Sequence, residues 1–573
     1  MWAYGASVLA GVLQGFSMAW PSFAFGEALG IAGQSFGLLQ VFSLAGLGAL
    51  LLHVASHEVE SSLSKRQAPK RAWLKGAKIS GLFATAAMSS TWGWLYVSMH
   101  QYGGLPSWLA ALAVVLLAMA LSVYFAIAGG VWVALYRKWF LHARQHEGRY
   151  ATHAKSFLLR SEVNLGLAGA VMFAALWTLA ELARGQWFTG FPWGAAGYAH
   201  GNSLLAVYAP WVGVYGMGAI AALVAIGAPL MVSVMLSRRT RAGWVLLAGG
   251  VLLLFVLPAL LVRFVPSFTA PAGTMSVRLL QGNIPQDEKF IPGTGVQTAL
   301  TWYAEQLLAN PEPLVVTPET AIPVLPQQLP AAYWQSLNHK YAGRTDHQGA
   351  QNAEPGNRQL ALIGLPMGGA NVGFSNSVLA LGSGALKYRY DKQHLVPFGE
   401  FVPPFFQWFV RMMNIPLGDF GQQRTYASVL SWQGQRLLPQ ICYEDLFGEE
   451  VAQYFANEDQ APTVLVNMSN LAWFGNTTAS AQHTAISQLR ALEFQRPVIR
   501  ATNTGLTALI NHKAEVTKAL PTFTRGVLVG EFEGRTGLTP YAQWTSQWGL
   551  WPLWLLCGAI VLFLGAFFRR SRS

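Results

Sequence analysis

Eight runs of mostly apolar residues recur along the chain, and they constrain its fold more than any other feature of the sequence. A helix needs about 20 apolar residues to cross the roughly 30 Å hydrocarbon core of a bilayer. Hydrophobic residues make up 53% of the 573 residues and charged residues only 11%, whereas a soluble globular chain carries about 25% charged residues. We therefore expect an integral membrane protein and exclude a disordered, collagen-like or purely soluble chain. The predicted spans are 3–22, 36–55, 79–98, 110–135, 163–183, 207–236, 243–264 and 547–568.

Basic residues concentrate on one side of these predicted spans. The loops 56–78 and 136–162, the turn after the sixth span and the C-terminal tail together carry eighteen Lys and Arg residues, whereas the opposite loops carry only Arg184. Cytoplasmic loops of membrane proteins hold an excess of Lys and Arg. We therefore expect both termini in the cytoplasm. The long region between the seventh and eighth spans is then expected on the far side, in the periplasm or outside the cell.

The net charge of +12 raises the question of nucleic-acid binding, which needs a basic polar domain. Between Thr269 and Ser546 the sequence has 18 basic and 20 acidic residues. The positive excess therefore lies in the segments that flank the apolar runs, as expected for a membrane protein. The sequence predicts no nucleic-acid partner.

The region 268–546 alternates short β-branched runs with helical stretches, a pattern typical of an α/β domain. We expect a membrane domain with seven helices over 1–267, the α/β domain over 268–546, and an eighth helix with a basic cytoplasmic tail over 547–573. The predicted strands are 277–283, 314–319, 360–366, 377–381, 437–442, 463–469, 497–503 and 506–510, the predicted helices are 296–309, 446–457 and 479–495, and 342–358 is a predicted surface loop.

Three side chains that could carry chemistry stand at the ends of strand-like runs. Glu319 closes the predicted strand 314–319, Lys392 closes the run LKYRYDK (386–392), and Cys442 closes the predicted strand 437–442. Groups at strand ends of α/β sheets converge on one crevice. A Cys nucleophile needs a base for its proton and a cation or N–H groups for the developing oxyanion, and this set supplies them. From spacing alone, a buried inert cysteine with a surface glutamate and a surface lysine is the more common arrangement. No His/Cys cluster has metal-ligand spacing, so we expect neither a metal nor another cofactor.

Longer motifs around these residues favour a catalytic set over an inert cysteine with a surface glutamate and a surface lysine. Three of them resemble, in the same order, the catalytic motifs of the nitrilase, or carbon–nitrogen hydrolase, superfamily: PETAIP (318–323), YDKQHLVPFGE (390–400) and ICYED (441–445). Others resemble its membrane-embedded branch: QGNIPQ (281–286), NMSNLAWFG (467–475), RPVIRATNTG (496–505) and AELARGQWFTGFPWGAAGY (180–198). The chain thus resembles the apolipoprotein N-acyltransferase family of the bacterial inner (cytoplasmic) membrane over nearly its whole length.

The resemblance implies an α-β-β-α sandwich carried by a membrane domain of about eight helices, with the sandwich in the periplasm. It implies that Cys442 is the nucleophile, that Glu319 is the general base and then the acid, and that Lys392 stabilises the tetrahedral oxyanion. The backbone N–H of Tyr443 is implied to complete the oxyanion hole.

Two further glutamates match the family motifs. Glu400, from the PFGE motif, is implied to orient Lys392 or the base, and Glu444 matches the residue that follows the Cys-Tyr pair. The implied reaction is a two-step transfer. Cys442 takes a fatty acyl chain from a membrane phospholipid as a thioester, and the α-amine of the N-terminal diacylglyceryl-cysteine of an apolipoprotein then accepts it.

Aromatic residues near these motifs could contact lipid. The apolar segment 401–420, with Trp408, follows the Lys392 motif, and such a segment can enter the membrane interface or form plain core. Trp473 and Phe474 could enter the interface in the same way. Phe290 stands where the family often has tryptophan, and Leu471 replaces an acidic residue of the family pattern, which affects the substrate pocket and not the reaction class.

Glu181 and Arg184 stand three residues apart at the end of the fifth predicted span, hence on one helix face. A charge pair at membrane depth is a functional candidate by default. The sequence leaves two roles open. One is structural, with the two side chains pairing with each other or capping the neighbouring loop, and the other is binding of a lipid headgroup.

Two other functions use the same features. A membrane-tethered amidase or nitrilase would carry the same three residues and release its acyl group to water. It would need neither the apolar segment nor eight spans. A transporter with a degenerate hydrolase domain should show polar or broken spans paired across two halves, and the predicted spans hold almost no charge.

Overall fold

The computed structural model describes residues 1–57, 67–147, 155–238, 267–342, 359–369, 373–382, 388–401 and 428–570. The chain divides into a helical unit and an α/β unit. The helical unit comprises 1–93, 111–266 and 548–573, and the α/β unit comprises 94–110 and 267–547. The predicted span 243–264, the predicted loop 343–358 and the segment 402–420 with Trp408 lie outside the described residues.

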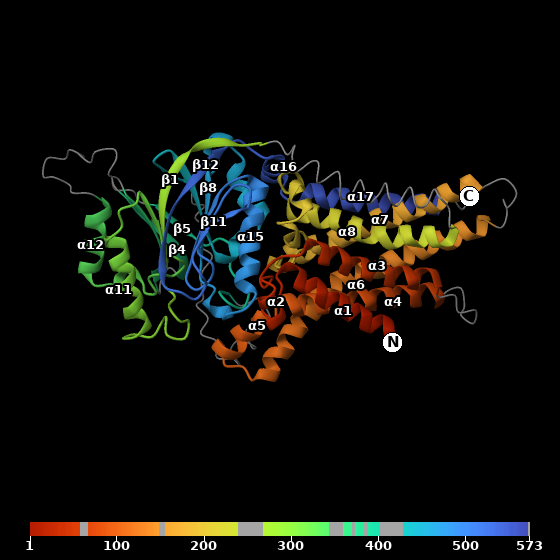
Figure 1. Ribbon diagram of the computed structural model, residues 1–573, viewed down its shortest axis with the longest axis horizontal. Coiled ribbons are helices and arrows are strands. Elements are labelled where there is room, and N and C mark those ends of the chain that lie inside the picture. Colours follow the sequence, from red (N-terminus) through yellow and green to blue (C-terminus); the bar gives the residue numbers. More distant parts are fainter. Residues whose placement is uncertain are drawn as a thin grey trace. The chain divides into compact units, whose positions relative to one another are not determined.

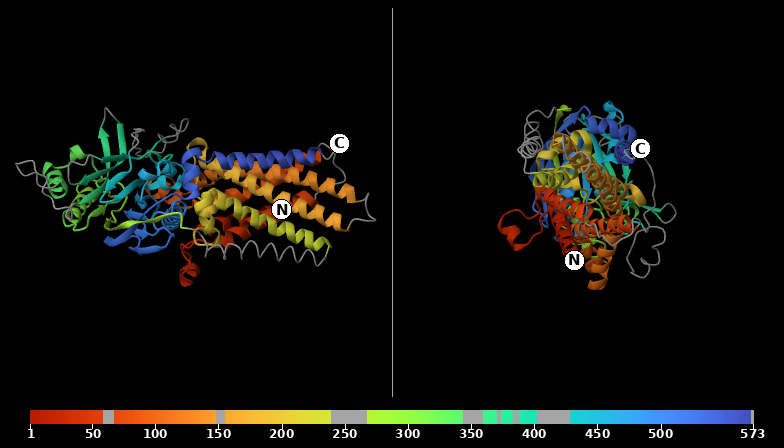
Figure 2. Two further views of the ribbon diagram at one scale, coloured as in Figure 1. Left: turned by 90° about the horizontal axis from the view of Figure 1, so that it is seen from above. Right: turned by 90° about the vertical axis from the view of Figure 1, so that its right-hand side faces the viewer.

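Long helices that run side by side build the helical unit (Figures 1 and 2). Helix α1 packs against α3 and α4, and α7 packs against α8 and α17. Large apolar side chains on α6 and α17 stay exposed, among them Leu116, Val123, Leu562 and Phe563. A bundle with apolar residues on its outer surface suits lipid and not water. The helices are α1 (Trp2–Met18), α2 (Ala24–Ala28), α3 (Gly37–His57), α4 (Gln67–Thr91), α6 (Ser107–Glu147), α7 (Lys155–Gln186), α8 (Ala209–Arg238) and α17 (Trp551–Arg570).

Four helical segments among the described residues are long and apolar enough to cross a membrane: 37–56, 107–141, 165–189 and 204–230. A fifth candidate combines α16 (Pro540–Trp548) with the first part of α17 across a bend. Helix α1, at 17 residues, is shorter than the roughly 20 residues of a full span. The predicted span 79–98 breaks, because α4 ends at Thr91 and a short helix, α5 (Trp94–Val97), follows.

In the described part of the α/β unit, the strands form two six-stranded sheets, with orders β12-β1-β2-β3-β4-β5 and β11-β10-β9-β8-β7-β6. At the centre of each sheet three strands run parallel, β1-β2-β3 in the first and β7-β8-β9 in the second. The strands are β1 (Ala270–Gln281), β2 (Leu314–Val316), β3 (Leu360–Gly369), β4 (Gly373–Gly382), β5 (Tyr388–Asp391), β6 (Leu430–Trp432), β7 (Gln435–Ile441), β8 (Val464–Ser469), β9 (Val498–Thr502), β10 (Ala508–Ile510), β11 (Val516–Ala519) and β12 (Gly526–Thr536).

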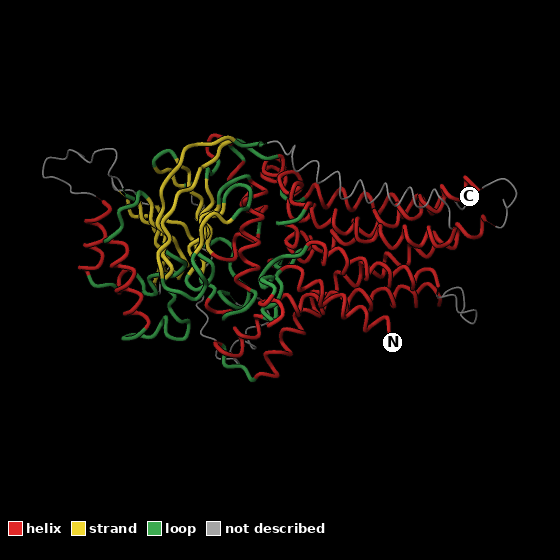
Figure 3. Tube along the Cα trace, viewed as in Figure 1, coloured by secondary structure: helices red, strands yellow, loops and turns green. Residues whose placement is uncertain are grey.

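The two sheets pack face to face, and helices cover both outer faces (Figures 1 and 3). Buried residues of both sheets, such as Leu279, Leu362 and Val466, form the central core. Helices α11 (Gly295–Leu308) and α12 (Ala331–Ala342) cover the first sheet. Helices α14 (Gly448–Ala452), α15 (Ala479–Phe494) and α16 cover the second. The unit is therefore an α-β-β-α sandwich.

Several predicted boundaries were wrong for local reasons. The predicted strand 314–319 ends at Val316, because Pro318 has no N–H to continue the ladder. The predicted helix 446–457 is instead a series of short turns around α14. Strands β6, β11 and β12 were not predicted, and β5 was indicated only by the run LKYRYDK that ends at Lys392. Strands β5 and β6 are only four and three residues long, too short to show an alternating pattern, and β11 is exposed throughout.

The segment 94–110 groups with the α/β unit although it lies between two helices of the helical unit in sequence. Trp94 Nε1 donates a hydrogen bond to Gln482 Oε1 at 3.0 Å, and its ring packs on Phe474 with centroids 4.4 Å apart. The ring of Tyr102 meets Trp473 edge-on. These contacts place Phe474 inside an aromatic cluster of the α/β unit.

Candidate active site

The sandwich brings the three predicted catalytic side chains to strand ends. Glu319 lies in the turn after β2, Lys392 is the first residue after β5, and Cys442 is the first residue after β7. Glu319 and Lys392 are buried, with 7% and 5% exposure, and Cys442 is half-buried. Burying an ionised group without a partner costs several kcal/mol or more, so the partners of these groups determine what the site can do.

Lys392 sits between two carboxylates. Its Nζ lies 2.8 Å from Glu400 Oε1 and 3.3 Å from Glu319 Oε1. Asn376 Nδ2 donates to the same two oxygens, at 3.2 Å and 2.7 Å. The main chain also holds the lysine in place, since Lys392 N donates to Asn376 O at 2.9 Å. Burial lowers the pKa of Lys392, but Glu400 and Glu319 outweigh burial and raise that pKa overall, so the side chain is a cation.

The Cys442 thiol is electrostatically coupled to this group. Burial and the charge of Glu319 raise the pKa of Cys442 well above its ordinary value, and Lys392 acts in the opposite direction. The resting cysteine is therefore a thiol and not a thiolate. A thiol needs a base in order to attack a carbonyl carbon, and among the charged groups that shift the pKa of Cys442, Glu319 has the largest effect.

The Glu319 turn is anchored from several sides. Its Oε2 accepts from the backbone N–H of Asn470 at 2.7 Å. Lys289 Nζ donates to its backbone carbonyl at 3.3 Å. A Cβ at Gly364 on β3 would lie 2.2 Å from Pro318 O, so only glycine lets the turn pack this closely against the strand. Glu319 is therefore held by main-chain contacts as well as by charge.

Glu444 joins the Lys392 loop to the Cys442 loop. Its Oε1 accepts from the backbone N–H groups of Gln393, at 2.5 Å, and His394, at 3.3 Å. Its Oε2 accepts from Ile441 N at 2.6 Å and from Tyr390 Oη at 2.8 Å. Burial raises the pKa of Glu444 to about 7, against the effect of these donors. Glu444 thus fixes the spacing of two strand ends without touching the thiol.

Two family models match the chain. The apolipoprotein N-acyltransferase N-terminal domain matches residues 10–227, and the carbon-nitrogen hydrolase domain matches residues 277–541. An apolipoprotein N-acyltransferase of Verminephrobacter eiseniae is 45% identical to the chain, and the match covers 96% of the chain and 94% of the relative. The enzyme of that name from Ralstonia nicotianae is 40% identical, covering 93% and 90%, and that from Bordetella bronchiseptica is 38% identical, covering 93% and 94%.

The chain belongs to the apolipoprotein N-acyltransferase family.

The predicted lipid-contact residues of this apolipoprotein N-acyltransferase family member have different surroundings. Phe290 is 51% exposed and Trp473 is 38% exposed. Phe474 packs on Trp94 instead of projecting freely. Trp408 lies outside the described residues. Phe290 and Trp473 therefore remain the best-exposed candidates for contact with an acyl chain.

Glu181 and Arg184 hold the loop that follows α7. Glu181 Oε1 accepts from Ala196 N at 2.8 Å. Arg184 Nη1 donates to the backbone carbonyls of Phe191 and, at 3.0 Å, of Trp193. Of the two roles that the sequence left open, capping of the neighbouring loop is the one that these contacts support.

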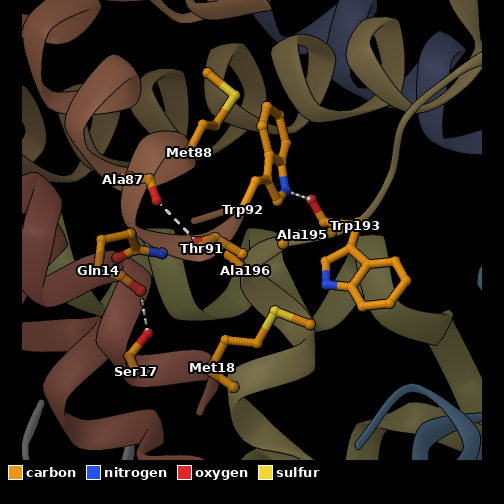
Figure 4. Close-up of a pocket in the computed structure, with 12 residues that line it drawn as sticks. Gln14, Ser17, Met18, Ala87, Met88, Thr91, Trp92, Trp193, Ala195 and Ala196 are labelled. Carbon is orange, nitrogen blue, oxygen red and sulfur yellow. Dashed lines mark hydrogen bonds between the residues drawn. The ribbon is translucent and has the colours of Figure 1, made fainter. Parts of the chain in front are cut away.

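A small cavity in the helical unit lies beside this loop, between α1 and α4 (Figure 4). Trp92 Nε1 donates to Trp193 O at 3.0 Å along its wall, and the Thr91 hydroxyl donates to Ala87 O at 2.8 Å. Its volume of about 30 Å³ is enough for about one or two water molecules. A cavity of this volume is too small for an acyl chain.

Sequence reasoning missed several residues of the site. Lys289, Asn376 and Asn470 contact Glu319 or Lys392 but carry no spacing signal, because strand pairing brings them there from distant segments. His483 stands in none of the motifs named above, yet it contacts the Cys442 carbonyl. Two of the motifs offered a signal nearby, since Lys289 follows QGNIPQ by three residues and Asn470 lies within NMSNLAWFG.

Proposed function

We propose that the chain transfers a fatty acyl chain from a membrane phospholipid to the α-amine of the N-terminal diacylglyceryl-cysteine of an apolipoprotein. The observation that carries the proposal is the meeting of Lys392 with Glu319 and Glu400, electrostatically coupled to Cys442. The full-length relatives named apolipoprotein N-acyltransferases support the same reaction.

In the first step, Glu319 accepts the Cys442 proton while the sulfur attacks the ester carbonyl carbon. The carbonyl oxygen becomes an oxyanion, which the Lys392 ammonium and the Tyr443 N–H stabilise. Collapse breaks the ester C–O bond, and Glu319 returns the proton to the leaving alkoxide. A lysophospholipid leaves, and the acyl group stays on Cys442 as a thioester.

In the second step, the acceptor amine attacks the thioester carbonyl and passes a proton to Glu319. The new oxyanion collapses with cleavage of the C–S bond, and the proton returns to the sulfur. The triacylated lipoprotein leaves and Cys442 is a thiol again. Donor and acceptor use one site in turn, so ping-pong kinetics follow.

The proposed setting is the bacterial inner membrane, with eight spans and both termini in the cytoplasm. The membrane domain covers 1–267, the catalytic domain covers 268–546 on the periplasmic side, and the last helix and tail cover 547–573. The basic loops on one side of the apolar runs support this orientation. The site needs neither a metal nor an organic cofactor for these steps.

The test is acyl transfer by the full-length protein in mixed micelles that contain a defined phospholipid and a synthetic diacylated lipopeptide. Mass spectrometry should find an N-acylated lipopeptide and an equal amount of lysophospholipid, and Cys442→Ala should abolish both. Release of free fatty acid with no acylated peptide would identify a hydrolase and overturn the transferase proposal.

A further inference from the structure

The backbone of Cys442 is held by two side chains behind it. Cys442 has a φ of 54°, a conformation that a non-glycine residue keeps only where its surroundings impose it. Its carbonyl oxygen lies 3.3 Å from Asn467 Nδ2, on β8, and 3.3 Å from His483 Nε2, on α15. Both side chains are fully buried.

Arg500 determines which atom of His483 carries the proton. Arg500 Nη2 lies 3.2 Å from His483 Nδ1, and a guanidinium can only donate. Nδ1 therefore accepts, and Nε2 carries the hydrogen. This N–H points to Asp445 Oδ1 at 2.9 Å and to the Cys442 carbonyl. His483 thus donates from Nε2 to the nucleophile's backbone.

The same arginine fixes the amide of Asn467. Asn467 Oδ1 accepts from Ser469 Oγ at 2.6 Å and from Arg500 Nη1 at 3.3 Å. The carbonyl side of the amide is therefore occupied by donors, and its NH₂ group faces the Cys442 carbonyl. Asn467 and His483 therefore both donate to this carbonyl, because Arg500 occupies the acceptor atom of each side chain.

The carbonyl of Cys442 and the N–H of Tyr443 belong to one peptide group. In a planar trans peptide the C=O and N–H bonds point in opposite directions. Holding the oxygen toward β8 and α15 directs the Tyr443 N–H to the other side. We propose that Asn467 and His483 are positioning residues that aim the Tyr443 N–H at the oxyanion by holding the Cys442 carbonyl. This rests on the proposed function, which assigns the oxyanion to that N–H.

The test compares two reactions of the same thiol in the full-length protein. Alkylation by iodoacetamide forms no oxyanion, whereas acylation by a 4-nitrophenyl ester does, and the released nitrophenolate reports it. Asn467→Asp keeps the size of the side chain and the acceptor for Ser469 and Arg500, but it turns the donor into an acceptor. We expect acylation to fall about 100-fold, the typical effect of losing one oxyanion donor, with alkylation changed less than about threefold.

A pair of variants at His483 repeats the test. His483→Gln places an amide N–H at about the reach of Nε2 and should retain most of the acylation rate. His483→Met has no donor and should lose it as Asn467→Asp does. Asn511→Asp makes the same chemical change in the turn between β10 and β11 and should leave both rates unchanged. Thermal unfolding verifies that each variant is folded.

Three results would overturn the proposal. These are equal losses of acylation and alkylation in Asn467→Asp and His483→Met, unchanged acylation in both variants, and a wild-type protein that releases nitrophenolate no faster than Cys442→Ala. The ester is not a phospholipid, so failure of phospholipid as the donor would leave the comparison intact.

Discussion

Lys289 donates a hydrogen bond from Nζ to the backbone carbonyl oxygen of Glu319 at 3.3 Å, although only 1% of the lysine is exposed. Burial lowers the pKa of Lys289 to about 8, against the opposing effect of the Glu319 charge. A lowered pKa means that the folded protein holds this cation at a cost in free energy of folding. Lys289 therefore lowers the stability of the fold while it holds the proposed base in position.

Lys289→Met should raise the apparent Tm at pH 7 and lower acylation of Cys442. The buried charge disappears, but the Glu319 turn loses its anchor, and a misplaced catalytic group can cost about 10²-fold in rate. Between pH 8 and 10.5 the unfolded chain binds more protons at this site than the folded one, so wild-type stability should rise there. Calorimetry at pH 7 and 10 checks this.

The Tm difference between Lys289→Met and wild type should therefore shrink as the pH rises. Lys513→Met removes an exposed lysine and is the matched control. Its Tm difference from wild type should be the same at the two pH values. A Tm difference that stays constant with pH for Lys289→Met would show that its charge does not strain the fold.

Glu444 should impose a pH limit on acylation. Burial raises its pKa to about 7, so the carboxylate gains a proton as the pH falls below that value. A protonated oxygen cannot accept from both of its donors, and the loops of Lys392 and Cys442 then lose their link. The single-turnover rate should rise with pH through about 7 in the wild type.

Glu444→Gln replaces one acceptor oxygen by NH₂, which faces two donors. We expect a rate about 10- to 100-fold lower that no longer rises through pH 7. If the variant keeps the wild-type pH profile at a reduced rate, the titrating group is a different one.

Glu400→Gln should weaken the oxyanion partner without unfolding the protein. Lys392 loses its 2.8 Å contact with a charged oxygen and keeps its 3.3 Å contact with Glu319, so the ammonium is held less firmly for the oxyanion. We expect acylation to fall about 10²-fold, within the range for loss of acid–base function. Glu533→Gln breaks an ion pair with Arg535 whose carboxylate is 43% exposed, and it should have no effect on the rate. Equal rates for the two variants would remove Glu400 from the mechanism.

The proposed orientation predicts which residues an impermeant maleimide reaches in intact spheroplasts. In a protein without its two native cysteines, Lys513→Cys in the α/β unit should react before permeabilisation, and Ser571→Cys in the basic tail only after it. The reverse order of labelling would contradict the positive-inside assignment.

The sequence identifies Glu319, Lys392 and Cys442 as the proposed reactive trio, because each stands in a local motif near a strand end. It does not predict what holds them. Asn376 reaches Glu319 through the pairing of β4 with β3 and β5, and Asn467 reaches Cys442 through the pairing of β8 with β7. Such contacts depend on the register of strands that are far apart in sequence, which periodicity does not encode.

The strands also differ in how well the sequence predicts them. Central strands such as β8, which is buried at every position, are evident from continuous apolar runs. The exposed edge strand β11 has no such run, and β12 alternates only in part. Long apolar runs predict the long helices well. The apolar run 79–98 nevertheless includes Trp94, whose ring and N–H contact Phe474 and Gln482 of the α/β unit.

The central claim is that Cys442 carries the acyl group as a thioester. Intact-protein mass spectrometry after incubation with a defined phospholipid and no acceptor tests it most directly, with Cys442→Ala and Cys557→Ala alongside. We predict a mass gain of one acyl chain in the wild type and in Cys557→Ala, removed by hydroxylamine and discharged by a diacylated lipopeptide, and no gain in Cys442→Ala. A folded wild-type protein that gains no acyl mass, or a gain that persists in Cys442→Ala, would contradict the account.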